Sequence, residues 1–440
     1  MKMLGGIPVF EVEFDNSGRL FAPAQMTDLA ARLQAQGVTD LVLFSHGWNN
    51  DMADARELYS NLFTALGPFT ATMTGRRFAA AAILWPSKKF TDEDLIPGGG
   101  AAALGGREKA VIRARLKDLA KESVRLGKSA PVSAAKAKRI AKAEALLKTL
   151  EAEPRAQEEF VRIVRSLLSD KSAHADDGTR DLFKLSERKL LDNLSRPVVV
   201  AAKPGQGGAA GFSTLPTTDA GGVADLGDSI LSGIRRLMNL TTYYQMKDRA
   251  GSVGVNGVAP MIDKLRKKFP ELRVHLAGHS FGGRVVTAAT DAAGGTDKID
   301  SLTLLQAAYS HNGLATKFDG KSDGFFRKVV TGKKVRGPIV ITCTKNDKAV
   351  GIAYPLASRM GGQNAAALGD ENDPYGGMGR NGAQKTPEAS KGMLQAVNAA
   401  YGFKGGSIYN LNADAVITGH SDICKAPVAW ALASAIATTG

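Results

Sequence analysis

The stretch RVHLAGHSFGGRVV, residues 273–286, runs from apolar residues into a serine set between glycines. Its spacing predicts a strand over 272–277, a tight turn, and a helix over 283–293. Glycine suits the flanks of such a turn, because a Cβ there would collide with the neighbouring backbone. The turn would hold Ser280 at a helix N-terminus, where backbone N–H groups face developing negative charge. G-x-S-x-G alone arises by chance about once in every three chains this rich in glycine, so its surroundings decide what it means.

Strands and helices alternate on both sides of this stretch. Near-continuous apolar runs, typical of buried parallel strands, occur at 40–47, 78–86, 301–308, 338–344 and near 408–413. The run VFEVEF (9–14) alternates apolar and acidic residues, which predicts a half-buried edge strand. Helical spacing occurs at 25–37, 51–67, 229–249, 256–269 and 427–437. The sequence therefore predicts an α/β fold with a mostly parallel sheet covered on both faces.

The alternation breaks between two glycine-rich linkers, 94–106 and 203–222. The sequence between them is rich in alanine and lysine and predicts helices to about residue 195. We therefore expect a first core segment (1–93), a basic helical insertion with flexible flanks (94–222) and a second core segment (223–440).

Much of the net charge of +14 lies in the insertion, where residues 107–148 hold 13 basic and four acidic side chains. One interpretation is a solvated helical face, and the other is a surface for anionic lipid, a polyanion or a partner protein. Nucleic acid is not expected as a partner, because this window has no aromatic side chain on which bases would stack.

A serine nucleophile needs a base, and the chain has six histidines. His420, in AVITGHSDI, follows a strand and precedes the last helix, which is the position in chain order expected for the base. Asp347 lies in a polar loop three residues beyond the apolar run of PIVITCT, where its carboxylate would orient the imidazole of His420. The predicted catalytic residues are therefore Ser280, Asp347 and His420. Three other acids between Ser280 and His420 are weaker candidates because none directly follows a strand: Asp323, Asp370 and Asp373.

The stretch LVLFSHGWNND (41–51) predicts the site's oxyanion-binding loop. Gly47 permits a tight turn after the strand, and the N–H of Trp48 would point into the site beside that of Phe281. His46 is interpreted as a structural hydrogen-bonding residue, and either Asn49 or Asn50 would brace the loop. The supporting residues of the predicted site are His46, Gly47, Asn49, Gly278, His279 and Gly282.

Four motifs, HGW, GHSFGG, TKND and TGHSDI, each follow a predicted strand, and in this order they resemble the α/β-hydrolase superfamily. GHSFGG in particular is similar to the nucleophile turn of lipases and esterases. The resemblance covers roughly residues 5–90 and 228–440. It implies a mostly parallel eight-stranded sheet, an insertion that acts as a cap, and hydrolysis through an acyl-enzyme with no metal or organic cofactor. The fold does not imply a substrate, so the ester is expected to be either a small molecule or a lipid.

Two other functions stay open beside a serine esterase. One is a lipase or phospholipase that acts at anionic membranes, and the other is a non-catalytic scaffold that binds partners through its basic helices. No run reaches the 18 apolar residues of a membrane span, so no transmembrane segment is expected. The start MKMLGGIPVFEVEF lacks the apolar core of a signal peptide. We expect a cytoplasmic location, with export by a signal-less route left open.

Overall fold

The computed structural model describes residues 1–48, 50–87, 105–120, 122–125, 128–195, 230–294, 299–353 and 370–439. The two predicted linkers lie outside these ranges, except that residues 105–106 begin a helix.

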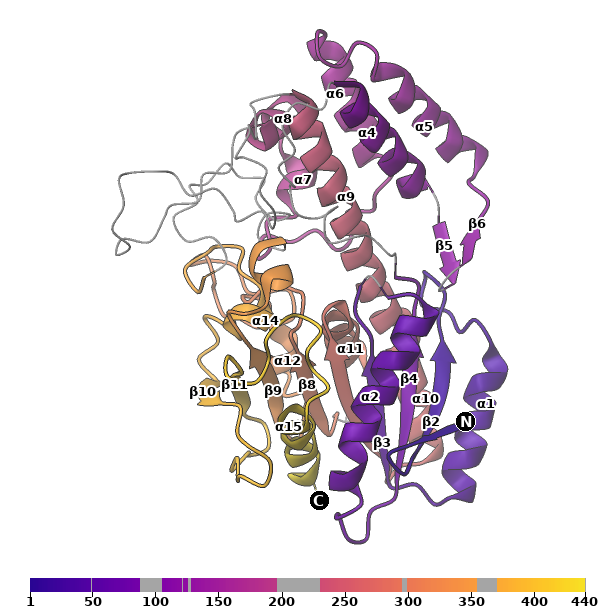
Figure 1. Ribbon diagram of the computed structural model, residues 1–440, viewed down its shortest axis with the longest axis vertical. Helices are drawn as coiled ribbons and strands as arrows, with labels where there is room; N and C mark the ends of the chain where they lie inside the picture. The colour runs from indigo at the N-terminus through magenta and orange to yellow at the C-terminus, as the bar shows by residue number, and fades with distance from the viewer. Residues whose placement is uncertain are drawn as a thin grey trace.

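A nine-stranded sheet forms the lower part of the molecule in Figure 1. Its spatial order is β1-β2-β4-β3-β7-β8-β9-β11-β10; only the β1–β2 pair is antiparallel. The prediction of an α/β fold with a mostly parallel sheet is confirmed. The strands are β1 (Lys2–Leu4), β2 (Ile7–Glu13), β3 (Asp40–Ser45), β4 (Phe78–Leu84), β7 (Arg273–His279), β8 (Ser301–Leu305), β9 (Ile339–Cys343), β10 (Ala389–Met393) and β11 (Ile408–Asn412).

Two expectations about the sheet are wrong. The described residues form nine strands of this sheet rather than eight, and β2 is not at the edge, because β1 pairs with one side of β2 and β4 with the other. Of the alternating acids of β2, one is paired at the surface and the other is buried. Glu11 forms a two-pronged ion pair with Arg56, and Glu13 is only 2 % exposed.

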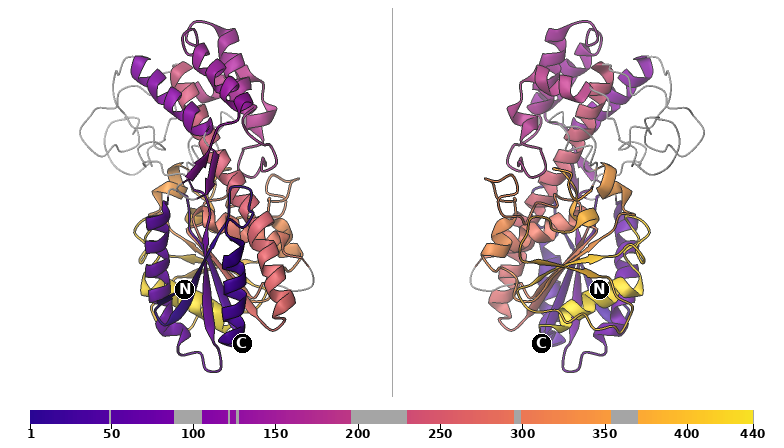
Figure 2. Two further views of the ribbon diagram at one scale, coloured as in Figure 1. Left: turned by 90° about the vertical axis from the view of Figure 1, so that its right-hand side faces the viewer. Right: turned by 90° about the vertical axis from the view of Figure 1, so that its left-hand side faces the viewer.

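Helices cover both faces of the sheet (Figures 1 and 2). Successive side chains of a strand point to opposite faces. Accordingly, Leu41 and Leu43 of β3 belong to one hydrophobic core, and Val42 and Phe44 belong to the other. The second core includes α2 and α15, while α10 and α11 pack in the first. The helices around the sheet are α1 (Pro23–Ala35), α2 (Met52–Thr70), α10 (Ala259–Lys268), α11 (Phe281–Ala292), α12 (Arg327–Thr331), α14 (Met378–Asn381) and α15 (Ala426–Ala437). A short π-helical turn, η2 (Ala349–Ala353), follows β9.

The insertion forms a helical layer beyond one end of the sheet (Figure 1). It contains α4 (Gly105–Ala120), α5 (Ala134–Leu146), α6 (Pro154–Arg165), α7 (Asp181–Lys184) and α8 (Glu187–Ser195). A small antiparallel pair, β5 (Glu122–Arg125) and β6 (Lys128–Ala130), was not expected from the sequence. The long helix α9 (Ile230–Val253) packs against α4 and α8 and also against α11, and a π turn, η1 (Gly254–Val258), leads from it into α10.

The loop before α7 attaches the insertion to the sheet through buried polar contacts. Asp177 forms an ion pair with Lys247 of α9, both almost fully buried. The Asp176 carboxylate accepts a hydrogen bond from the Phe325 N–H at 3.0 Å, and its carbonyl accepts one from Ser310 Oγ at 2.6 Å. The described part of the insertion is therefore fixed to the loops that follow β8.

The excess positive charge of residues 107–148 is partly neutralised by acids that follow this window in the sequence, one in the turn after α5 and one in α6. Lys109 pairs with Glu151, and Lys142 pairs with Glu159. Within the described ranges, no helix is both long and apolar enough to cross a membrane.

Candidate functional site

The strand-to-helix turn at Ser280 has an unusual backbone conformation. Ser280 lies between β7 and α11 with φ 56° and ψ −126°, a region that non-glycine residues rarely adopt. Such strain costs on the order of 1–3 kcal/mol and is found mainly at functional sites. Neighbouring backbone holds the turn in place, since Ser280 N–H donates to Leu305 O and Ser280 O accepts from Ala308 N–H.

Three glycines let the surrounding backbone approach this turn closely. A Cβ on Gly278 would overlap the carbonyl of Gly282, and a Cβ on Gly282 would overlap the carbonyl of Ser45. A Cβ on Gly47 would lie 3.0 Å from Ser280 Oγ and closer still to Ser280 Cβ. The loop after β3 therefore packs directly against the predicted nucleophile.

The predicted base and acid lie side by side on the loops after β11 and β9. His420 Nδ1 is 2.7 Å from Asp347 Oδ2, and Asp347 is fully buried whereas the His420 side chain is 22 % exposed. The other carboxylate oxygen of Asp347 accepts the Val350 N–H at 2.9 Å. Because the carboxylate accepts the Nδ1 proton, the neutral ring carries its basic lone pair on Nε2. The other acids considered each accept from backbone within their own loops: Asp323 from Lys317, Asp370 from Asn372 and Asp373 from Tyr375.

Contacts that the sequence did not reveal join the loop of Asp347 to the loop of His420. The Asn346 side-chain amide donates to Asp414 O at 2.9 Å and to Ile417 O at 2.8 Å. Thr344 Oγ1 donates to the Asp414 carboxylate at 2.8 Å. These bonds fix the relative position of the two loops. In the sequence, only the polar run TKND, which supplies Asn346, indicates that such bonds could form.

His46 braces the loop after β3. Its Nδ1–H donates to Gly47 O at 2.8 Å, its Nε2 accepts the Trp85 N–H at 3.3 Å, and its ring is stacked on that of Trp85. Complete burial lowers the pKa of His46 to about 4, so the ring stays neutral. The Asn50 amide donates to both Gly47 O and Trp48 O, whereas Asn49 lies outside the described residues.

Trp48 and Phe281 lie together beside Ser280. Their rings meet edge to face with centroids 5.6 Å apart. The Phe281 N–H belongs to the first residue of α11, where backbone N–H groups have no partner within the helix. A helix N-terminus favours negative charge, so this position suits a developing oxyanion.

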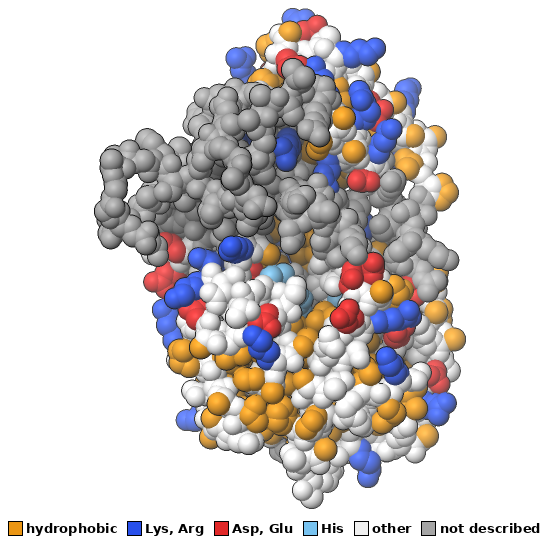
Figure 3. All heavy atoms as spheres, in the orientation of Figure 1, with side chains coloured by type: hydrophobic (Ala, Val, Ile, Leu, Met, Phe, Trp, Pro, Cys, Tyr) orange, Lys and Arg blue, Asp and Glu red, His pale blue; other side chains and the backbone are white. Residues whose placement is uncertain are grey.

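A cavity of about 830 Å³ opens beside Trp48 and His420, between α2 and the loop before α15. Figure 3 shows histidine side chains in the hollow of this face, with acidic groups nearby. Three acidic residues line the cavity against one lysine, so its charged lining is mildly acidic in a protein whose net charge is +14. The lining includes Trp48, His279, His420, Asp54, Glu57 and Asp422.

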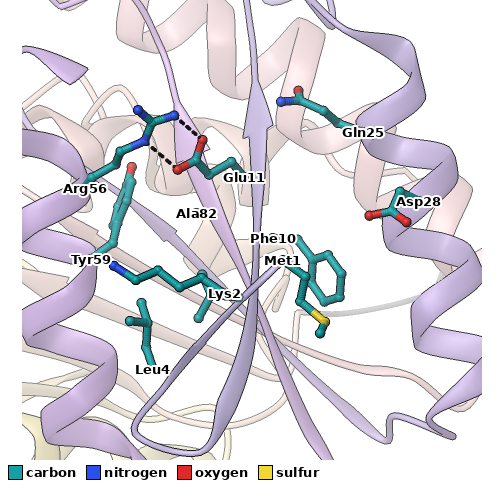
Figure 4. Close-up of a pocket in the computed structure, with 11 residues that line it drawn as sticks. Met1, Lys2, Leu4, Phe10, Glu11, Gln25, Asp28, Arg56, Tyr59 and Ala82 are labelled. Atoms are coloured by element: carbon teal, nitrogen blue, oxygen red, sulfur yellow. Dashed lines mark hydrogen bonds and ion pairs between the residues drawn. The ribbon is translucent and has the colours of Figure 1, made fainter. Parts of the chain in front are cut away.

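A second cavity, of about 460 Å³, lies between α1, α2 and the β1–β2 edge and contains the ion pair of Glu11 with Arg56 (Figure 4). Tyr59 lines it, and the Tyr59 hydroxyl also accepts from the His46 N–H and donates to Ile83 O. None of the predicted catalytic residues lines this second cavity.

In the described part of the chain, no group of three or more His, Cys, Asp or Glu side chains is arranged to hold a metal ion.

Comparisons with known proteins give no relative: no family model, curated protein or solved structure matches this chain.

Proposed function

We propose that this protein is a serine hydrolase of the α/β-hydrolase fold that cleaves carboxylic esters through an acyl-enzyme. The observation that carries the proposal is the 2.7 Å hydrogen bond between His420 and Asp347, on two loops at the same sheet edge as the strained turn of Ser280. A nucleophile at a strained strand-to-helix turn, with its base and acid on later loops, is the arrangement that acyl transfer uses.

In the proposed reaction, Ser280 Oγ attacks the ester carbonyl carbon while His420 Nε2 takes the hydroxyl proton. The carbonyl oxygen becomes an oxyanion held by the N–H groups of Trp48 and Phe281, and the Asp347 carboxylate stabilises the imidazolium. When the carbon–oxygen bond to the alcohol breaks, His420 returns the proton to the leaving alkoxide. A water molecule then attacks the acyl-enzyme by the same steps and releases the acid and free Ser280.

The insertion would act as a cap in this scheme. Its helices lie beyond the sheet, and its anchoring loop contacts the segments after β8 through Asp176 and α9 through Asp177. These contacts support a cap with a fixed base rather than one that swings as a whole.

Hydrolysis of p-nitrophenyl esters from acetate to palmitate tests the proposal. The wild type is expected to turn over at least the short esters, and Ser280→Ala is expected to lose at least a thousandfold, as triad removal does in other serine hydrolases. Turnover by Ser280→Ala at the wild-type rate would overturn the assignment.

The same proteins separate the two other functions. A lipase would prefer long chains presented in anionic vesicles, and added salt would weaken that preference. A folded wild type without any turnover would leave the scaffold, which binds through the basic helices, as the better account.

A further inference from the structure

His279 makes a contact with the predicted base that the reaction scheme does not use. It is the last residue of β7, directly precedes Ser280 and is 4 % exposed. Its Nε2 lies 2.9 Å from the main-chain oxygen of His420, and the two imidazole rings lie 4.7 Å apart at an angle of 41°. One side chain therefore connects the strand of the nucleophile to the loop of the base.

The chemistry of this contact fixes the state of the His279 ring. A carbonyl oxygen only accepts hydrogen bonds, so the ring proton is on Nε2. Burial lowers the pKa of His279 to about 3, and repulsion from His420 is the second cause. The hydrogen bond to the His420 backbone and the Asp347 carboxylate raise this pKa, but by less. His279 Nδ1 is buried and has no hydrogen-bond partner among the described residues. The ring is thus neutral, and its Nε2–H donates a hydrogen bond to the backbone of His420.

We propose that His279 is a positioning residue that holds the backbone of His420 and presents a neutral aromatic ring to its imidazole. This inference rests on the proposed function, because it assigns a role relative to the catalytic base. His420 lies on a loop rather than on a strand or helix, and a displacement of about 1 Å at a reacting group costs on the order of a hundredfold in rate. A bond from the rigid end of β7 restricts that displacement.

The neutral state of His279 also suits the charge that forms on His420. During attack the imidazole of His420 becomes a cation, and a neutral aromatic ring beside it is favourable, whereas a second cation would repel it. The groups that act electrostatically on His279 are His420, Asp347 and His46, and His46 is itself neutral. Leucine or phenylalanine at this position would keep the packing but not the bond.

Two substitutions of nearly equal polarity test the bond itself. In His279→Gln the side-chain amide nitrogen can reach the position of the histidine Nε2, so the hydrogen bond to His420 O is kept. In His279→Asn the side chain is shorter, and its amide nitrogen lies near the position of Nδ1, where it cannot form this bond. The control is His311→Gln, which replaces another buried histidine; His311 contacts Asn381 and lines neither cavity. Each full-length variant is assayed for kcat and KM with p-nitrophenyl butyrate, and for thermal unfolding.

We expect His279→Asn to lose about 10- to 100-fold in kcat with KM within about twofold of the wild type. His279→Gln is expected to recover most of that loss, and His311→Gln to stay close to the wild type in kcat. Equal kcat for the Asn and Gln variants, or a wild-type kcat in His279→Asn, would overturn the inference while leaving the proposed function intact. An inactive, folded wild type would instead overturn the proposed function and this inference with it.

Discussion

Gly47→Ala is the most informative single change at the predicted site. The new Cβ would lie 2.4 Å from Ser280 Cβ and 3.0 Å from Ser280 Oγ, where ordinary contacts are 3.4–4 Å. The loop and the serine must therefore separate by about 1 Å to restore an ordinary contact, because both atoms that the new Cβ would meet belong to Ser280. Overpacking of this kind costs about 1–3 kcal/mol in the free energy of unfolding. A displacement of about 1 Å at the nucleophile costs about a hundredfold in rate.

Gly419→Ala is the matched control. A Cβ on Gly419 would meet no atom within 4 Å, its φ is not in the left-handed region, and it directly precedes His420. The assay is the second-order rate constant for labelling by a fluorophosphonate, together with the urea midpoint of each variant. We expect Gly47→Ala to label about a hundredfold more slowly than Gly419→Ala while both remain folded. Equal labelling rates would refute the close packing of this loop on Ser280.

The remaining predictions concern stability and the acid of the proposed triad. Burial lowers the pKa of His46 and of His311 to about 4, below the unfolded value of about 6.5. As the pH falls from 6.5 towards 4, these histidines therefore bind protons in the unfolded state but not in the folded state. We expect each histidine to lower the free energy of unfolding by about 2 kcal/mol at pH 5. Urea titrations at pH 7 and pH 5 check this, and an equal free energy of unfolding at the two pH values would contradict it. Asp40→Asn should cost about 3–5 kcal/mol, because it leaves Arg76, whose side chain is 9 % exposed, and the fully buried His275 without their carboxylate; a near-native melting temperature would contradict this. Asp347→Asn should keep the fold and lower kcat about 10⁴-fold; wild-type kcat would exclude Asp347 as the acid.

The parts of the fold that the sequence predicted are those with continuous apolar strands. β3, β4, β7 and β9 are buried on both faces, and their hydrophobic runs are therefore nearly continuous. The polar residues that follow such runs meet at one edge of a parallel sheet. This is why Asp347 and His420 were found from their places after strands, without any knowledge of their distance.

The strands that the sequence missed carry no such signal. β10 has the sequence ASKGM and is largely exposed, so its position is set by pairing with β11 rather than by a hydrophobic face. β1 is three residues long, and its presence turns β2 from an edge strand into an internal one.

The contacts within the site depend on segments far apart in the chain. The bond from His279 to His420 O spans 141 residues, and the bonds from Asn346 span about 70. Residue type alone does not indicate which carbonyl a histidine or an asparagine will meet. Hence the sequence predicts the chemistry of the site, and only the fold gives its supporting bonds.

The central claim is that Ser280 is a nucleophile activated by His420. The most direct test is to treat the full-length protein with a fluorophosphonate, digest it, and locate the adduct by mass spectrometry. We predict one adduct, on Ser280, which is absent in Ser280→Ala and forms at least a hundredfold more slowly in His420→Ala. A folded protein that forms no adduct, or forms it on another residue, would contradict the account.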